Sequence, residues 1–282
     1  MRNVLLVLEY DGTDFHGFQL QTGQRTVQGD LEAALRRITG ESIRVAGAGR
    51  TDAGVHAAGQ VASFRTASAL PTARLLRALN AVLPPDVAVR TGREVPPEFH
   101  ARFSARRRSY RYSIWNAEAP APLLRRYTYH LQGSLDAEAM HRAARQIVGT
   151  HDFASFAGTT GEASRDGERT TVRTVFEADC RRPGEPAELL EVSVSANAFL
   201  PHMMRNLVGT LLQVGSGKVN EAGFAAILAA RDRSAAGPTA PARGLCLTEV
   251  VYEPSALGGL SPGLAEAVAE SRPEADRRPG AL

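Results

Sequence analysis

Apolar residues along this chain switch repeatedly between two periodicities, and this alternation constrains the fold more than any other feature of the sequence. Val4 to Tyr10 is an apolar run of strand length, followed by the polar loop Asp11 to Asp14. Between Thr26 and Gly40 the apolar residues instead recur at helical spacing, with Thr26 suited to cap the helix and Gly40 to end it. We therefore expect a layered fold built from both strands and helices.

The rest of the chain continues the same alternation. It predicts further strands at residues 42–46, 60–65, 86–95, 110–115, 127–131, 172–180, 189–195 and 245–252, and further helices at 75–82, 136–148, 203–212 and 221–230. Strands that come in neighbouring pairs, with helices between the pairs, favour an α+β class with antiparallel or mixed sheets and helices on one face. A boundary after Ser104 predicts an N-terminal domain at 1–104 and a C-terminal domain at 105–253.

Two stretches lack the periodicity of packed elements. Residues 158–171 are rich in Gly, Ser, Thr and charged residues, and residues 254–282 contain few large apolar side chains among their prolines and glycines. We expect neither stretch to pack, and we expect the tail from residue 254 to be disordered.

The composition is that of a globular protein, with 43% hydrophobic and 22% charged residues among 282. No apolar run approaches the roughly 20 residues of a membrane span, and the N-terminus turns polar too soon for a signal peptide. The two cysteines, Cys180 and Cys246, and the seven histidines show no spacing typical of metal ligands. We therefore expect a cytoplasmic protein with no membrane segment, disulfide framework or metal.

Arginine supplies nearly all of the positive charge, because Lys218 is the only lysine among 33 Lys and Arg residues. Genomic composition is the simpler explanation of that bias. The clustering is more informative, since Tyr110 and Tyr112 are surrounded by arginines at positions 102, 106, 107, 108 and 111. Basic residues interleaved with aromatic ones are typical of surfaces that bind a nucleic-acid backbone and stack on its bases.

A glycine-rich loop from Gly47 to Gly54 surrounds Asp52 and permits a large ligand to approach the backbone closely. It is not a dinucleotide-binding motif, because Asp52 stands where the third glycine is required and no helical pattern follows. The stretch from Gly215 to Lys218 is not a phosphate-binding P-loop, because Leu212 and Val219 occupy positions that require Gly and Ser or Thr. No nucleotide cofactor is therefore expected.

The segment from Gly49 to Ala57 resembles the active-site motif of the tRNA pseudouridine synthase A family. Other motifs similar to those of the family follow its order along the chain, at residues 9–19, 99–104, 110–112, 151–156, 199–209 and 244–247. The resemblance spans residues 3–252. Its departures are small: Pro201 precedes His202, and Cys246 stands where a larger side chain is expected.

This resemblance implies two ferredoxin-like α/β halves that form one extended, mostly antiparallel sheet, with helices on one face and a central catalytic cleft. It implies an isomerase that converts uridine to pseudouridine in the anticodon arm of tRNA, at tRNA positions 38, 39 and 40, without a cofactor or metal. It also implies a homodimer in which one tRNA contacts both subunits.

The resemblance makes Asp52 the catalytic carboxylate. The reaction breaks the glycosidic bond, turns the base and joins its C5 atom to C1′ of the ribose. An ionised aspartate could add to the base, add to the sugar or take a proton from the ribose, and the sequence leaves these routes open. An aspartate that only shapes a turn is the competing interpretation, and the accompanying motifs favour catalysis.

Two further residues are implied to act beside Asp52. Arg205 would keep the carboxylate charged, whereas the alternative is an arginine on a helix surface. Removing one member of a buried ion pair typically costs about 3–5 kcal/mol, so Arg205→Ala is expected to impair both stability and activity. Tyr110 matches the family's active-site tyrosine, which stacks on the target base, although a tyrosine packed in the core of a strand is a close alternative.

The remaining site residues are implied to bind RNA. Arg50 would fill the gap left by the flipped base or hold a phosphate, and Leu245 would line the uracil pocket. Arg106, Arg107 and Arg108 would follow the phosphate backbone. A surface charge at Arg50, a core position at Leu245 and a solvated charge run at 106–108 are the alternatives.

Three other functions stay open from the sequence. The chain could be a tRNA-binding or RNA-folding protein on the same scaffold without catalytic activity, although the presence of Asp52, Tyr110 and Arg205 argues against this. It could be a synthase of broader range that modifies other tRNA positions or other RNAs. An enzyme for small molecules is the remotest alternative, because the nucleotide-binding motifs fail.

Overall fold

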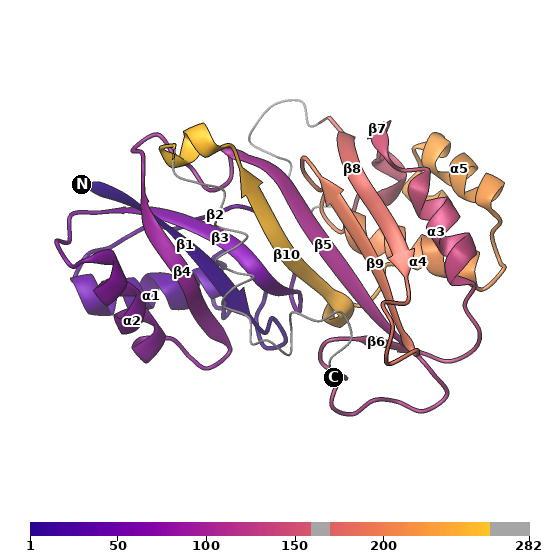
Figure 1. The fold of residues 1–282 in the computed structure, drawn as a ribbon, viewed down its shortest axis with the longest axis horizontal. Coiled ribbons are helices and arrows are strands. Elements are labelled where there is room, and N and C mark those ends of the chain that lie inside the picture. The colour runs from indigo at the N-terminus through magenta and orange to yellow at the C-terminus, as the bar shows by residue number, and fades with distance from the viewer. Residues whose placement is uncertain (159–169, 260–282) are drawn as a thin grey trace. The chain divides into compact units, whose positions relative to one another are not determined.

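Figure 1 shows a computed structural model of the chain, which describes residues 1–158 and 170–259. Within these residues the chain forms two compact units. Unit 1 contains residues 1–108 and 246–259, and unit 2 contains residues 109–158 and 170–245.

Unit 1 is a sheet whose strands run in the order β4-β1-β3-β10, with a short strand β2 also paired to β3. These strands are β1 (Arg2–Tyr10), β2 (Ala46–Gly47), β3 (His56–Thr66), β4 (Val87–Val95) and β10 (Leu245–Tyr252). Strand β1 pairs antiparallel with both β3 and β4, whereas β10 pairs parallel with β3. Val4 to Leu8 are fully or almost fully buried, which places the core of unit 1 around the middle of β1.

Two helices pack beside each other in unit 1, α1 (Val27–Thr39) and α2 (Thr72–Val82) (Figure 1). The caps expected for the first helix are confirmed. The Thr26 side chain accepts a hydrogen bond from the Gly29 backbone amide, and Gly40 ends the helix in the left-handed conformation with φ of 74°.

Unit 2 orders its strands β5-β9-β8-β7, with β6 paired parallel to β5. They are β5 (Ala105–Asn116), β6 (Tyr129–Leu131), β7 (Gly149–Asp152), β8 (Val172–Arg181) and β9 (Leu189–Ala196), and the boundary between the units falls inside β5. The helices are α3 (Ala137–Arg145), α4 (Met203–Gly215) and α5 (Glu221–Ala230). Short 3-10 turns lie at Ala154–Phe156, Arg233–Ala235 and Ala242–Gly244.

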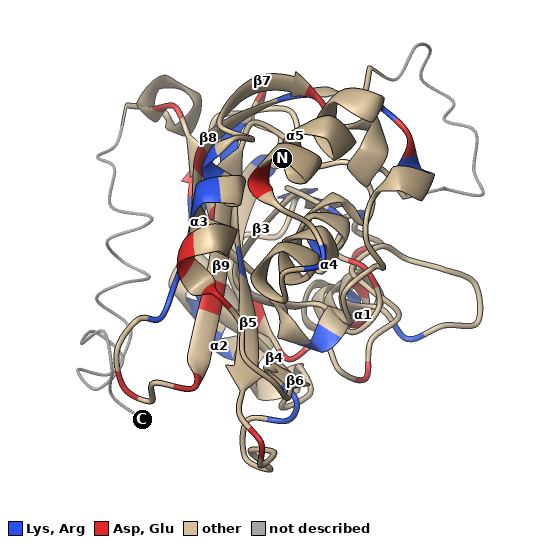
Figure 2. Cartoon of the chain, turned by 90° about the vertical axis from the view of Figure 1, so that its right-hand side faces the viewer, with Lys and Arg blue, Asp and Glu red and all other residues tan. Residues whose placement is uncertain are grey.

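Helix α3 shows why the local sequence forms a helix here. Asp136 caps its first turn by accepting a hydrogen bond from the Ala139 backbone amide. Glu138 lies in the first turn, and Arg142 and Arg145 lie in the last, so both signs of charge complement the helix dipole (Figure 2). Met140, Ala143 and Ala144 form the buried face.

Both units combine helices with mostly antiparallel strands, so the expected α+β class is confirmed. The expected division placed all of residues 105–253 in the second domain. In the structure, residues 105–108 and all but the first residue of β10 belong to unit 1. For β10 the reason is its pairing with β3 at Cys246 and Leu247. That the halves are ferredoxin-like stays a prediction.

The strand expected at residues 42–46 is wrong over most of its length, since only Ala46–Gly47 forms a strand. Side chains of α1 occupy the backbone groups that a neighbouring strand would use. The Val45 backbone amide donates to Glu32 Oε1 at 3.0 Å, and the Val45 carbonyl accepts from Gln28 Nε2 at 3.2 Å.

The expected disorder of the tail is wrong at its beginning. Pro254–Leu257 forms a 3-10 turn, and the Leu257 side chain is buried. Residues 260–282, and residues 159–169 of the other stretch expected to be unpacked, lie outside the described residues.

Candidate active site

The glycine-rich loop that carries Asp52 packs against a second loop, at residues 11–19, which follows β1. The Phe18 backbone amide donates to the Thr51 carbonyl at 3.2 Å, and the Gly54 amide donates to the Phe15 carbonyl at 3.2 Å. The backbones approach most closely at two glycines. A Cβ atom on Gly12 would lie 2.0 Å from the Val55 carbonyl oxygen, and one on Gly17 would lie 2.5 Å from that of Thr51. The two loops therefore form a single packed layer that only glycine permits at these positions.

A buried chain of hydrogen bonds lies under the Asp52 loop. The Tyr10 hydroxyl lies 2.8 Å from Thr51 Oγ1, and Gln60 Nε2 donates both to the Tyr10 oxygen at 3.4 Å and to the Gly49 carbonyl at 3.0 Å. The Tyr10 oxygen thus accepts from Gln60 and shares a second hydrogen bond with the Thr51 hydroxyl, in which either group can be the donor. Burial raises the pKa of Tyr10 well above its ordinary value, so the hydroxyl keeps its proton. These hydrogen bonds fix Gly49 and Thr51, the residues on either side of Arg50, within the Asp52 loop.

We expect Tyr10→Phe to lower kcat by about tenfold with little change in KM, because losing one hydrogen bond to Thr51 of about 1 kcal/mol loosens the loop that positions Asp52. Steady-state kinetics on a tRNA substrate measure the effect. Asn80→Ala on α2 is the matched control, since it removes two hydrogen bonds to Val89, which join α2 to β4 rather than to the loop. An equal loss of kcat in both variants would show general destabilisation instead.

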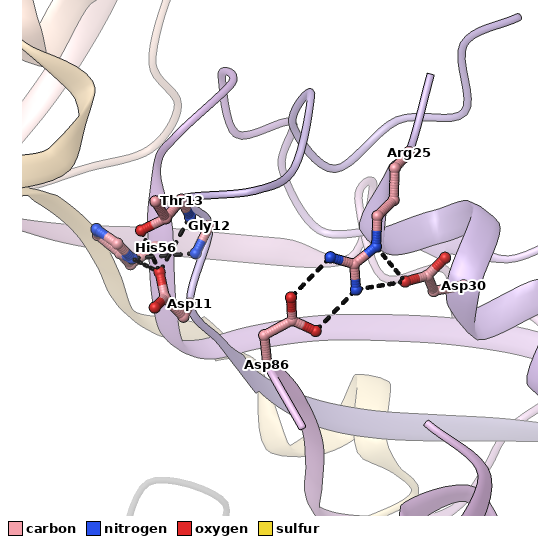
Figure 3. Close-up of polar contacts among 7 residues, drawn as sticks. All are labelled: Asp11, Gly12, Thr13, Arg25, Asp30, His56 and Asp86. Carbon is pink, nitrogen blue, oxygen red and sulfur yellow. Dashed lines mark hydrogen bonds and ion pairs between the residues drawn. The ribbon is translucent and has the colours of Figure 1, made fainter. Parts of the chain in front are cut away.

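Arg25, Asp30 and Asp86 form a charged clamp (Figure 3). The clamp holds the C-terminal end of the segment at residues 11–25, which begins with the 11–19 loop. The Arg25 guanidinium makes a bidentate ion pair with Asp86, both bonds at 2.8 Å, and its Nε donates to Asp30 at 3.0 Å. The same guanidinium lies 4.0 Å above the Phe15 ring. The Asp86 ion pair raises the pKa of Arg25, so the clamp keeps its charge. No pattern in the sequence indicates this clamp, because its partners are far apart in the chain.

His56, directly after the Asp52 loop, holds the turn at Asp11 (Figure 3). Its Nδ1 accepts a hydrogen bond from the Gly12 backbone amide at 3.0 Å and lies 3.2 Å from Asp11 Oδ1, which itself accepts from Thr13. His56 is buried and helps to fix the two loops together.

The predicted site residues of unit 1 lie on the same loop. Asp52 is half-buried and Arg50 is exposed, and the buried Thr51 separates them. The structure therefore presents a carboxylate and a guanidinium two residues apart on a loop that the packing holds in place.

The three arginines at 106–108 differ in their surroundings. Arg106 is the most exposed and lies 3.6 Å from Glu253, whereas Arg107 pairs with Glu249 at 3.2 Å. Arg108 is half-buried and donates to the backbone carbonyls of Ala48 and Arg102, at 2.9 and 2.7 Å. Their role in binding a phosphate backbone stays a prediction, and Arg106 is the most accessible of the three.

The other predicted site residues belong to unit 2. Tyr110, on β5, is 8% exposed, and its ring packs edge-on against Phe199 at 4.8 Å. Leu245, the first residue of β10, is also buried. Arg205, in the first turn of α4, donates from Nε to the Ala240 carbonyl at 2.7 Å. Their roles stay predictions.

A buried asparagine, which the sequence analysis did not single out, anchors α4 next to Arg205. Asn206 is fully buried, donates to the Phe156 carbonyl at 2.8 Å and accepts from Thr239 Oγ1 at 2.6 Å and from Arg233 at 3.1 Å. Its only sequence signal was its place beside Arg205 in a family-like segment. The network holds the 233–240 segment whose Ala240 carbonyl orients Arg205.

Neither a metal cluster nor a helix able to cross a membrane occurs in the part of the chain that the structure describes. In residues 1–158 and 170–259, no three His, Cys, Asp or Glu side chains gather as metal ligands would. No helix in these ranges is both long enough and apolar enough to cross a membrane.

Comparison with known proteins gives consistent matches. A family model described as tRNA pseudouridine synthase matches residues 6–104 and 143–253. A protein of Roseiflexus castenholzii named tRNA pseudouridine synthase A is 51% identical over 255 residues, which cover 89% of this chain and 91% of that protein. Proteins of the same name from Chloroflexus aurantiacus and Acetivibrio thermocellus are 49% and 44% identical, over 93% and 89% of this chain and 93% and 100% of theirs.

One solved structure, of a Cbf5-Nop10-Gar1 complex, aligns with 96% of this chain and 70% of its own at 11% identity, but its TM-score of 0.32 is too low to indicate a shared fold. The family match covers most of the chain, and the relatives align over nearly their whole length. The resemblance noted at Gly49 to Ala57 is thereby confirmed at the level of the family. This chain belongs to the tRNA pseudouridine synthase family, whose members are isomerases that convert uridine in tRNA to pseudouridine.

Proposed function

We propose that this protein forms pseudouridine in the anticodon arm of tRNA, at tRNA positions 38, 39 and 40, with Asp52 as the catalytic carboxylate and no cofactor. The Asp52 loop is the observation that carries the proposal. Asp52 is half-buried between Thr51, which is 6% exposed, and a turn that ends at Val55, which is 2% exposed. A carboxylate that solvent and substrate can reach is thus held on a rigid frame, as a catalytic group requires.

The reaction is an isomerisation, so the nucleoside neither gains nor loses an atom overall. The N1–C1′ bond breaks, the C5–C1′ bond forms, and the proton lost from C5 is balanced by one gained at N1. An ionised Asp52 serves by adding to the base, by adding to the sugar or by taking a proton from the ribose. A primary isotope effect with uridine deuterated at C2′ is expected only for the last route, so this measurement separates it from the other two.

The other site residues support this chemistry in the proposal. Tyr110 stacks on the target base through a ring that Phe199 already orients, and Leu245 supplies an apolar wall for uracil. Arg205 keeps Asp52 ionised, and Arg50 occupies the gap left by the flipped uridine. Arg106, together with Arg107 and Arg108, contributes to binding of the RNA backbone.

The test is to incubate the purified protein, without metal or cofactor, with unmodified tRNA transcripts and map pseudouridine at nucleotide resolution. Signal confined to the anticodon arm supports the proposal, whereas signal at other positions supports a synthase of broader range. Tight, salt-sensitive binding of several tRNAs without any pseudouridine would favour a tRNA-binding protein. Comparing intact tRNA with an isolated anticodon stem-loop shows whether contacts outside the arm select the substrate.

We also propose a cytoplasmic homodimer, in which one tRNA contacts both subunits. The homodimer is what the resemblance to the family motifs implies. Sedimentation of the free protein tests the homodimer, because a mass of two chains is expected.

A further inference from the structure

Phe103 presents an exposed aromatic ring on unit 1 that the chemistry at Asp52 does not use. The residue is 75% exposed, more than any other aromatic residue of the described chain. It lies in the turn that joins residues 99–100 to the start of β5. A ring of this size left in water lacks the burial that usually stabilises an aromatic side chain.

The turn that carries Phe103 is firmly anchored on both sides of the ring. Ala101 is fully buried; its backbone amide donates to Ser63 Oγ at 3.0 Å, and its carbonyl accepts from the Tyr252 hydroxyl at 2.7 Å. The His100 and Ser104 backbones close the turn with a hydrogen bond of 2.9 Å. Phe103 therefore points outward from an ordered backbone, which lowers the entropic cost of binding a ligand there.

Two neighbours make the ring suitable for a nucleobase. The His100 ring lies 4.5 Å from the Phe103 ring at an angle of 35°, and the Arg102 guanidinium lies 5.5 Å from its centroid. His100 Nδ1 accepts from the Arg102 amide at 3.1 Å, and burial, together with the Arg102 charge, lowers the pKa of His100. The imidazole is therefore a neutral ring at pH 7, beside a cation that can reach a phosphate.

A different arginine, Arg108, ties this turn to the Asp52 loop. Arg108 donates to the Arg102 carbonyl in the turn and to the Ala48 carbonyl in the glycine-rich loop, at 2.7 and 2.9 Å. A base bound at Phe103 is thus held at a fixed position relative to the loop that carries Asp52.

We propose that Phe103, flanked by His100 and Arg102, is a stacking surface for an unpaired base of the tRNA substrate, other than the uridine that is modified. Arginine beside an exposed aromatic ring is the combination by which proteins hold single-stranded nucleotides without reading their sequence. An apolar protein partner would offer no counter-charge to the Arg102 guanidinium, 5.5 Å from the ring centroid, whereas an RNA backbone supplies phosphates. The proposal rests on tRNA being the substrate and adds a second contact to it.

The test measures the Kd of an unmodified tRNA transcript at one fixed salt concentration. Phe103→Ala is expected to raise Kd by about 5- to 150-fold, the usual range for loss of one base–aromatic stack. Phe103→Tyr is expected to bind as the wild type does, and Phe103→Leu as poorly as the alanine variant, because leucine keeps apolar area but cannot stack. Phe176→Ala on β8, also an exposed phenylalanine, is the matched control and is expected to leave Kd unchanged.

Three outcomes would overturn the proposal. They are an unchanged Kd in Phe103→Ala, full recovery of binding in Phe103→Leu, and a change of sedimentation in Phe103→Ala without tRNA, which would assign the ring to contact with a second copy of the chain. Binding is measured independently of catalysis. A wild type that binds tRNA through Phe103 but forms no pseudouridine would therefore contradict the proposed function and leave the stacking surface in place.

Discussion

Asp52→Asn is expected to abolish pseudouridine formation while the protein still binds tRNA. The substitution keeps the size of the side chain and the backbone hydrogen bond from Val55 to the Asp52 carbonyl at 3.1 Å, so the loop is expected to keep its shape. It removes the negative charge on which all three proposed routes depend. A loss of at least about 1,000-fold in single-turnover rate is therefore expected, with a Kd close to that of the wild type.

Asp14→Asn is the matched control for this variant. It removes the same charge from an exposed residue of the loop that packs against the Asp52 loop. Its rate is expected to match that of the wild type. Nearly full activity in Asp52→Asn would end the assignment of Asp52, and a loss of tRNA binding equal to the loss of rate would make the loop an RNA-docking feature.

The elements that could be predicted are those whose signals are local. Thr26 and Gly40 marked both ends of α1, because capping depends on residues within one turn of the helix end. Strand β7 was missed, since Gly149–Asp152 is too short to show a period and is defined by its antiparallel pairing with β8. Local pattern thus predicted the longer elements, whereas pairing partners far along the chain decided the short ones.

The candidate site likewise contains features that a local sequence motif predicts and features that depend on residues far apart in the chain. The Asp52 loop could be found because its residues are contiguous and resemble one family motif. The clamp of Arg25 on Asp86 could not, because 61 residues separate the two side chains. The sequence grouped Arg108 with its neighbours as a charge run, whereas in unit 1 its guanidinium holds the carbonyls of Ala48 and Arg102. A charge in a sequence does not show whether its partner is solvent, RNA or the protein's own backbone.

Gly17→Ala is expected to lower both stability and rate, because two separate effects act at this position. Gly17 has φ of +88°, where an alanine costs about 1–2 kcal/mol. Its new Cβ would also lie 2.5 Å from the Thr51 carbonyl oxygen, and overpacking of this kind typically costs a further 1–3 kcal/mol or so. Since Thr51 precedes Asp52, relief of the contact moves the carboxylate, and a displacement of about 1 Å lowers a rate by about 100-fold.

Gly23→Ala separates the two effects, because Gly23 lies in the same segment with φ of +72°, but a Cβ atom added there would meet nothing within 4 Å beyond its chain neighbours. The free energy of unfolding of Gly23→Ala is expected to fall by only about 1–2 kcal/mol, because of backbone strain. Its rate is expected to match that of the wild type. Urea unfolding and single-turnover kinetics, measured where circular dichroism shows each variant folded, compare the pair. If both glycine variants lose the same stability and keep the same rate, close packing of the two loops does not position Asp52. If only Gly17→Ala loses rate, the 11–19 loop is part of what holds the carboxylate in place.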